Sequence, residues 1–243
     1  MSPAELAAIL AHDDSHWWYR GRRRVIRAAL DGLQLPAACA ILDVGCGSGR
    51  MLDELRGYGI ASGLDVSPLA VAAAQARGHV VHLGEAAALP FDDASFDLLT
   101  CFDVLEHTLD DRGTLRELAR VCRPGGTLLV TVPAYESLWS RHDDANHHRR
   151  RYTASRLRTA AAEAGLAVEL DTYFNSLLLA PAALVLKLQR LRGATSERSN
   201  LELTPAYLNG VLELPMRLEA RALRAGMRMP AGLSLLAVLR RGA

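Results

Sequence analysis

The chain has 243 residues, of which 50% are apolar and 23% charged, and its formal net charge is +1. This composition excludes a disordered chain, and four cysteines without Cys-x-x-Cys spacing exclude a disulfide framework and argue against a zinc or redox site. The near-neutral balance gives no signal for nucleic acid. The N-terminus lacks the pattern of a signal peptide, and the longest apolar stretch, residues 177–186, is too short to span a bilayer. We therefore expect a cytoplasmic protein.

Short apolar runs alternate with amphipathic segments through most of the chain. This alternation predicts right-handed crossovers and a parallel sheet covered by helices on both faces, an α/β fold. A proline- and glycine-rich break at residues 123–126 should end one helix. Residues 173–232 depart from the alternation with a mostly helical pattern, which Pro215 should interrupt. The expected strands are 40–44, 60–66, 79–83, 96–101, 127–132, 166–172 and 232–240, and the expected helices are 50–56, 68–77, 115–122 and 153–164.

A glycine-rich turn follows the first expected strand, where Gly45, Gly47 and Gly49 precede a helix. Glycines there let the backbone approach a ligand closely, and the amides at the helix start favour a negative group. Asp65 follows Gly45 by about 20 residues, the spacing at which a dinucleotide fingerprint carries its ribose-binding carboxylate. Position 50 is arginine, however, so the third glycine of that fingerprint is missing. A nicotinamide-dependent oxidoreductase is therefore disfavoured.

Motifs between Ile41 and Val132 resemble those of class I S-adenosylmethionine-dependent methyltransferases, in the order and at the intervals of that family. The resemblance implies a doubly wound, Rossmann-like sheet of seven strands with the last strand antiparallel, and a helical insertion before that strand. It also implies an enzyme whose cofactor is S-adenosyl-L-methionine. The motifs are ILDVGCGSG at 41–49, GLDVSPLAV at 63–71, GEAAALPFDDASFDLLTCFDVLEH at 84–107 and LRELARVCRPGGTLLVTVP at 115–133.

The resemblance assigns cofactor contacts to the carboxyl ends of the expected strands. Asp43 would lie near the cationic amino group of the methionine part, and Asp65 would accept both ribose hydroxyls. Glu85, where the family usually has aspartate, would face the adenine amino group. The full expected set is Trp18, Arg23, Asp43, Gly45, Cys46, Gly47, Asp65, Val66, Glu85, Ala86 and Phe102.

An aromatic and basic cluster begins at His16, within an expected N-terminal helical cap at residues 1–38. One interpretation is a helix whose aromatic side chains pack on the sheet edge. Another is nucleic-acid stacking, for which one short cluster is weak support. The cluster is also similar to the HWW-type helix that lies over the cofactor in many bacterial methyltransferases. In that case Trp18 would make a cation–π contact with the sulfonium, and Arg23 would hold the methionine carboxylate.

Residues 139–153 follow the fifth expected strand at the carboxyl edge of the sheet, where open α/β sheets bind ligands. A helix-capping loop is one interpretation, but the histidines, the tyrosine and the consecutive arginines exceed what capping requires. His148, His142 and Tyr152 are therefore candidate bases or substrate contacts, and Arg149–Arg151 are candidate partners of a phosphate or carboxylate. Side chains of the types that bind metals are also present, namely His142, Asp143, His147 and His148. Their spacing matches no metal pattern, so no metal site is predicted.

We expect a cofactor-binding core at residues 39–172, completed by a final strand at 233–243, that methylates a small metabolite. O-methylation of an acceptor with an apolar and a phosphorylated part is the favoured reaction. The leucine-rich insertion, 173–232, would form a roof over the acceptor or the interface of a homodimer. Alternatives are a cofactor-binding or scaffolding protein without turnover, and a sugar or polyketide methyltransferase of a biosynthetic pathway. Nucleic-acid methylation is disfavoured because CFDVLEH stands where a DPPY-like motif would be.

Overall fold

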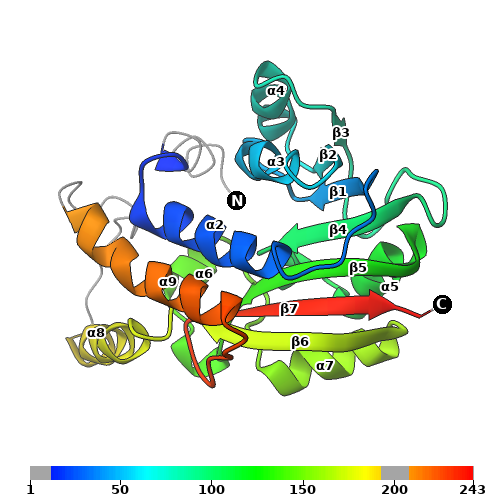
Figure 1. The fold of residues 1–243 in the computed structure, drawn as a ribbon. Helices are drawn as coiled ribbons and strands as arrows, with labels where there is room; N and C mark the ends of the chain where they lie inside the picture. The colour runs from blue at the N-terminus through cyan, green and yellow to red at the C-terminus, as the bar shows by residue number, and fades with distance from the viewer. Residues whose placement is uncertain (1–11, 193–207, 243) are drawn as a thin grey trace.

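A computed structural model describes residues 12–192 and 208–242 and contains one mixed β-sheet (Figure 1). Its strands are β1 (Ala40–Val44), β2 (Ile60–Asp65), β3 (Val81–Leu83), β4 (Phe96–Phe102), β5 (Cys122–Pro133), β6 (Leu166–Phe174) and β7 (Ser234–Arg241). The strand order is β3-β2-β1-β4-β5-β7-β6. β7 pairs antiparallel with β5 and β6, and all other pairs are parallel. The predicted seven-stranded sheet with an antiparallel last strand is therefore confirmed.

Helices cover both faces of this sheet. The helices are α2 (Trp17–Leu30), α3 (Arg50–Leu55), α4 (Pro68–Ala76), α5 (Asp111–Val121), α6 (Arg141–Ala145), α7 (Ala154–Glu163), α8 (Leu179–Arg192) and α9 (Asn209–Arg224), with short 3-10 turns η1 (Leu105–His107) and η2 (Glu136–Leu138). Because side chains of a strand alternate between faces, Leu128 and Val130 pack with α5 and α7, whereas Leu129 packs with α2, α3, α4 and α9. Within the described ranges, no helix combines the length and apolar composition needed to cross a membrane.

Two expected boundaries differ from the structure by more than two residues. α5 begins at Asp111 rather than Leu115, because the Asp110 carboxylate caps it by accepting a hydrogen bond from the Gly113 amide at 2.9 Å. β5 begins at Cys122, directly after α5, so residues 123–126 lie within a strand and not between elements. Cys122 pairs with Phe96 across a register shift, which lets the glycines continue the strand.

The expected interruption at Pro215 is wrong, because α9 is continuous from Asn209 to Arg224. Met216 and Ala220 on this helix are buried in the apolar cluster that includes α2, and this packing compensates for the hydrogen bond that proline cannot donate. α2 and α9 lie side by side (Figure 1). Their close contact depends on Gly21, since a Cβ atom there would lie 2.4 Å from Met216 Sδ.

The segment between β6 and β7 begins and ends at the carboxyl edge of the parallel strands. β6 runs parallel to β5, since both pair antiparallel with β7, and it continues to Phe174 before the chain turns. Glu219 of α9 fixes this turn by accepting hydrogen bonds from three backbone amides, at 2.6, 2.8 and 3.2 Å. The donors are Asn175, Ser176 and Leu177.

We predict that Glu219→Ala lowers the free energy of unfolding by about 2–4 kcal/mol, because it leaves three amides without their charged acceptor. Chemical denaturation monitored by circular dichroism measures this change. Glu163→Ala is the matched control. Its carboxylate pairs with Arg112 at the surface, at 2.8 Å, and its removal should cost less than about 1 kcal/mol. Equal effects of the two substitutions would contradict the anchoring role of Glu219.

Candidate functional site

The turn between β1 and α3 leaves open space at its centre. Gly45, Gly47 and Gly49 have φ angles of +78°, +54° and +76°, a region that favours glycine. A Cβ atom on Gly45 would lie 2.3 Å from Val104 Cγ2, so this glycine is required by the loop after β4. Nothing lies within 4 Å of a Cβ atom built on Gly47. There is therefore free space beside the backbone at Gly47, whereas Gly45 is exposed but has no room for a side chain.

Asp65 connects this turn to the end of β2. Its Oδ2 accepts a hydrogen bond from the Gly47 amide and its Oδ1 accepts one from the Ser67 amide, both at 2.9 Å. The Gly45 amide also donates to Leu64 O at 2.7 Å. These bonds hold the open glycine and the carboxylate next to each other, at the ends of two neighbouring parallel strands.

Asp43 is buried at the end of β1. The Thr100 hydroxyl donates a hydrogen bond to its Oδ1 at 2.6 Å. Burial raises the pKa of Asp43 to about 7, and the nearby Asp65 carboxylate acts in the same direction, whereas the hydrogen bond from Thr100 and the charge of Arg22 act against them. A nearby positive charge would therefore stabilise the ionised form of this carboxyl group.

The segment before α2 places a carboxylate against the glycine turn. Asp13 Oδ1 accepts a hydrogen bond from Arg23 Nη1 at 2.9 Å, and Asp13 Oδ2 accepts one from the Ser48 hydroxyl at 2.5 Å. Arg23, expected to hold a carboxylate of the cofactor, thus pairs with a carboxylate of the chain itself. The sequence gives no signal for Asp13, because its partners are distant along the chain.

The aromatic residues expected near the cofactor lie on neighbouring elements. Trp18 stacks on Phe174, with ring centroids 6.1 Å apart, which fixes α2 over the end of β6. Phe102 lies under the guanidinium of Arg22, which also forms an ion pair with Asp103 at 2.8 Å. Among the other expected contacts, Val66 and Glu85 are exposed, Ala86 is half-buried and Cys46 is buried.

On the other side of the β4 end, His148 is held by a buried carboxylate. His148 Nδ1 lies 2.8 Å from Asp143 Oδ1, and Arg151 donates to both oxygens of Asp143 at 2.8 and 2.9 Å. Burial alone would raise the pKa of Asp143, but these hydrogen bonds hold it well below its usual value. His142, also a candidate base, is exposed, and its ring centroid lies 6.1 Å from that of His148.

All three consecutive arginines are engaged within the protein, and Arg149 donates from Nε to His107 O at 3.2 Å. Arg151 binds Asp143, and Arg150 pairs with Asp111 at 3.0 Å and donates to two backbone carbonyls. Tyr152 is fully buried and donates its hydroxyl hydrogen to Asp111 at 2.8 Å. Burial and the Asp111 charge raise its pKa far above the usual value. These contacts stabilise the loop and leave Tyr152 without access to a substrate.

Glu106 and His107, which follow β4, complete the group around His148. Glu106 is 1% exposed, and neither of its carboxylate oxygens has a hydrogen-bond partner among the described residues. Burial, and then the Asp103 charge, raise its pKa well above the usual value. Burial also lowers the pKa of His107 to about 4. Its ring centroid lies 4.7 Å from that of His148. The sequence does not mark Glu106 as functional, since burial without a partner is visible only in the fold.

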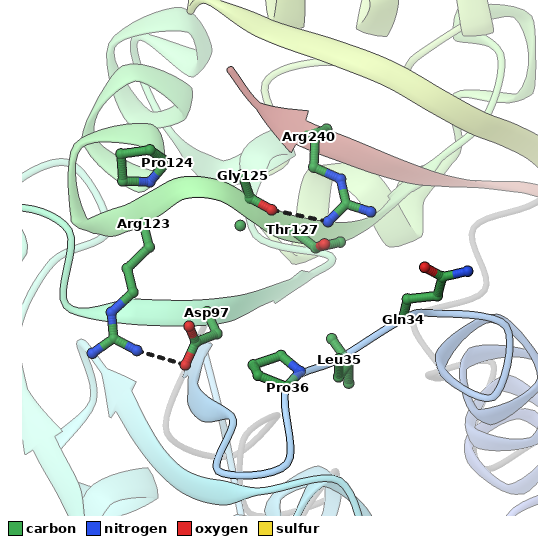
Figure 2. A pocket seen from close by; sticks show the side chains of 10 residues that line it. Gln34, Leu35, Pro36, Asp97, Arg123, Pro124, Gly125, Thr127 and Arg240 are labelled. Carbon is green, nitrogen blue, oxygen red and sulfur yellow. Dashed lines mark hydrogen bonds and ion pairs between the residues drawn. The ribbon is translucent and has the colours of Figure 1, made fainter. Parts of the chain in front are cut away.

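A separate hollow lies at the opposite edge of the sheet, where the parallel strands begin (Figure 2). Its wall includes two polar contacts, the Arg123–Asp97 ion pair at 2.6 Å and a hydrogen bond from Arg240 to Gly125 O at 3.0 Å. Open parallel sheets bind ligands at the carboxyl ends of their strands. The glycine turn, and not this hollow, is therefore the candidate site.

Known proteins match the central part of the chain. Residues 42–130, which run from β1 into β5, match the family model described as a methyltransferase domain. This match and the sheet topology agree with the class I methyltransferases, which use S-adenosyl-L-methionine as their cofactor.

Curated relatives match over part of their length. The chain is 39% identical over 107 residues to a demethylmenaquinone methyltransferase of Mycolicibacterium gilvum, covering 43% of this chain and 46% of that protein. It is 32% identical over 164 residues to a probable S-adenosylmethionine-dependent methyltransferase of Mycolicibacterium smegmatis, covering 64% and 62%. The chain thus spans about half of the length of the first of these and somewhat more of the second.

A solved structure matches over nearly the whole chain. It comes from the complex between the Haloferax volcanii Trm112 methyltransferase activator and a methyltransferase. The TM-score is 0.66 at 25% identity, and the match covers 99% of this chain and 95% of that one. The similarity therefore includes the elements on both sides of the family match.

The raised pKa of Asp43 predicts a specific pH dependence. Between about pH 4 and pH 7 the folded protein retains a proton on Asp43 that the unfolded chain releases, so stability falls as the pH rises. Asp43→Asn removes this titration. The quantity to compare is the free energy of unfolding of Asp43→Asn minus that of the wild type, both without ligand. This difference should be a few kcal/mol larger at pH 8 than at pH 4. Urea denaturation across this pH range measures the difference, and a constant offset would contradict the assignment.

Proposed function

We propose that the protein transfers a methyl group from S-adenosyl-L-methionine to an oxygen atom of a small metabolite. The observation that carries this proposal is the open backbone at Gly47 beside the Asp65 carboxylate. A dinucleotide fingerprint would have its third glycine at position 50, where this chain has arginine, and a cofactor without phosphates does not require that glycine. When bound, the cofactor supplies a methyl group that is activated by the sulfonium.

Three charged groups support binding of the methionine and ribose parts. Asp65 offers its carboxylate to the ribose hydroxyls, and Asp43 offers a compensating charge to the amino group. Arg23 pairs with the carboxylate of Asp13, which is the kind of contact that a methionine carboxylate would make in its place. We infer that Asp13 occupies the position of this carboxylate and moves aside when the cofactor binds.

The acceptor is proposed to lie between this turn and His148. Methyl transfer requires alignment of donor and acceptor and exclusion of water, and a hydroxyl acceptor also needs a base. The Asp143 carboxylate orients His148 through Nδ1, so that Nε2 is available to take the hydroxyl proton. Because Arg150 and Arg151 have partners within the chain, we do not assign them to a phosphate of the substrate.

The apolar part of the acceptor is proposed to lie against α8. This helix follows the turn at the carboxyl edge, and several of its apolar side chains are exposed, among them Leu184, Val185 and Leu188. α9 packs on α2 through Met216 and Ala220, although Val211, Leu214 and Leu218 of this helix are also exposed. The first half of the insertion is therefore the proposed roof, whereas the homodimer interface stays an alternative for the same exposed leucines.

Calorimetry with the cofactor tests this function. The wild type should bind S-adenosyl-L-methionine and not NAD, and Asp65→Ala should weaken binding by about 1.5–3 kcal/mol, the scale of hydrogen bonds to a charged group. Asp92→Ala, which changes an exposed acid, should leave the dissociation constant unchanged. Thermal unfolding of each variant controls for the loss of the Gly47 and Ser67 contacts. Tighter binding of NAD, or an unchanged constant in folded Asp65→Ala, would refute the proposal.

A further inference from the structure

Three potential metal ligands meet beyond the end of β4. Glu106 and His107 belong to η1, and His148 follows α6, so two segments distant in sequence contribute. One ligand atom of each residue lies within 4.8 Å of those of the other two. We call these residues the Glu106 cluster. The set differs from the residues that the loop sequence alone suggests, and it shares only His148 with them.

Among the described residues, Glu106 has no hydrogen-bond or ion-pair partner for its carboxyl group. Its side chain is buried and both of its oxygens lack a hydrogen bond within the described part of the chain. The two arginines whose charges act on Glu106 have other partners, since Arg22 pairs with Asp103 and Arg151 with Asp143, each at 2.8 Å. Burying a carboxyl group without hydrogen bonds costs free energy, and a buried carboxylate costs more unless it is paired or binds a metal. A cation would supply this missing compensation.

His148 is oriented in the way that metal-bound histidines usually are. Its Nδ1 faces the Asp143 carboxylate at 2.8 Å, which leaves Nε2 to act as a ligand. Asp143 is fixed in turn by Arg151 and by the Ser140 amide, which donates at 2.7 Å. A carboxylate behind a histidine fixes the ring orientation and increases the basicity of the ligand nitrogen. The adjacent His107 ring is nearly perpendicular to that of His148.

We propose that Glu106, His107 and His148 form a binding site for one transition-metal dication, such as Zn²⁺ or Mn²⁺. Two imidazoles and one carboxylate suit these ions, whereas Mg²⁺ and Ca²⁺ prefer oxygen ligands throughout. Ligand atoms about 2.1 Å from a tetrahedral ion lie roughly 3.4 Å apart. The side chains therefore need to close by little more than 1 Å from their spacing of at most 4.8 Å.

The location of the cluster suggests what the cation does, and this step rests on the function proposed above. Val104, which precedes η1, is the residue that contacts the Gly45 position, so the cluster lies close to the glycine turn. A cation here would hold the oxygen of the acceptor hydroxyl and lower its pKa, and the proton would pass to solvent water. His148 would then serve as a ligand and not as the base. The acceptor class is a metabolite with a hydroxyl group that can coordinate a metal.

Titration with the metal alone tests the site without any methyl transfer. Protein treated with a chelator and desalted is titrated with MnCl₂, and the loss of the free Mn²⁺ signal is followed by electron paramagnetic resonance. The wild type should bind one Mn²⁺, and ZnCl₂ should displace it because Zn²⁺ binds such ligands more tightly. Asp143→Asn should weaken binding by about 10- to 100-fold, as expected for a group that orients a ligand. Glu106→Gln and His148→Gln, which remove ligands, should weaken it more.

Matched variants separate this site from adventitious binding. His147→Asn changes an exposed histidine of the same loop, with a residue that tolerates its φ of +56°, and should leave the affinity unchanged. Glu106→Gln replaces an unpaired buried carboxylate, so it should fold, and thermal unfolding without metal checks this. No binding by the wild type, or equal binding by wild type, Glu106→Gln and His148→Gln, would overturn the proposal. Mn²⁺ binding without cofactor binding would refute the proposed function and leave the metal site standing.

Discussion

The common direction of β1, β2, β4 and β5 is the constraint on which the site depends. Parallel strands bring their carboxyl ends to one edge of the sheet, where Asp43, Asp65 and Asp103 lie at or next to the ends of β1, β2 and β4. The hydrogen bond between the Gly47 amide and Asp65 joins the first two of these ends. Without it, the open backbone and the carboxylate next to it would not be held in one geometry. The antiparallel β7 starts at this same edge and lies between β5 and β6.

Backbone strain is concentrated at this edge. Asp103, Tyr135 and Asn175 follow β4, β5 and β6, and their φ angles are +55°, +58° and +58°. Residues other than glycine in this region cost about 1–3 kcal/mol each and persist only where the surrounding structure fixes them. Here the fixing contacts are visible for two of them. Asp103 pairs with Arg22, and the Asn175 amide donates to Glu219. The stability of the sheet therefore supports a strained rim around the proposed acceptor position.

The sequence predicts the parts of the site that depend on local pattern. The glycine turn and Asp65 follow from a strand, a run of glycines and a carboxylate at a fixed distance, and each keeps its expected place in the fold. Pro215 shows the limit of local signals, because tertiary packing of Met216 on Gly21 keeps α9 continuous through it. The arginines at 149–151 show another limit. Asp111 and Asp143 form ion pairs with two of them, and no local pattern in the sequence marks these acids as their partners. Asp13 and Glu106 depend on long-range contacts or on burial, which no single segment reveals.

A crystal structure with S-adenosyl-L-homocysteine, the product form of the cofactor, tests the central claim most directly. Our account predicts density over Gly47 with the ribose hydroxyls against Asp65, and with the amino acid part at Arg23 in the place that Asp13 now takes. Ligand density in the hollow lined by Asp97 and Arg240, or a ligand whose ribose does not contact Asp65, would contradict it.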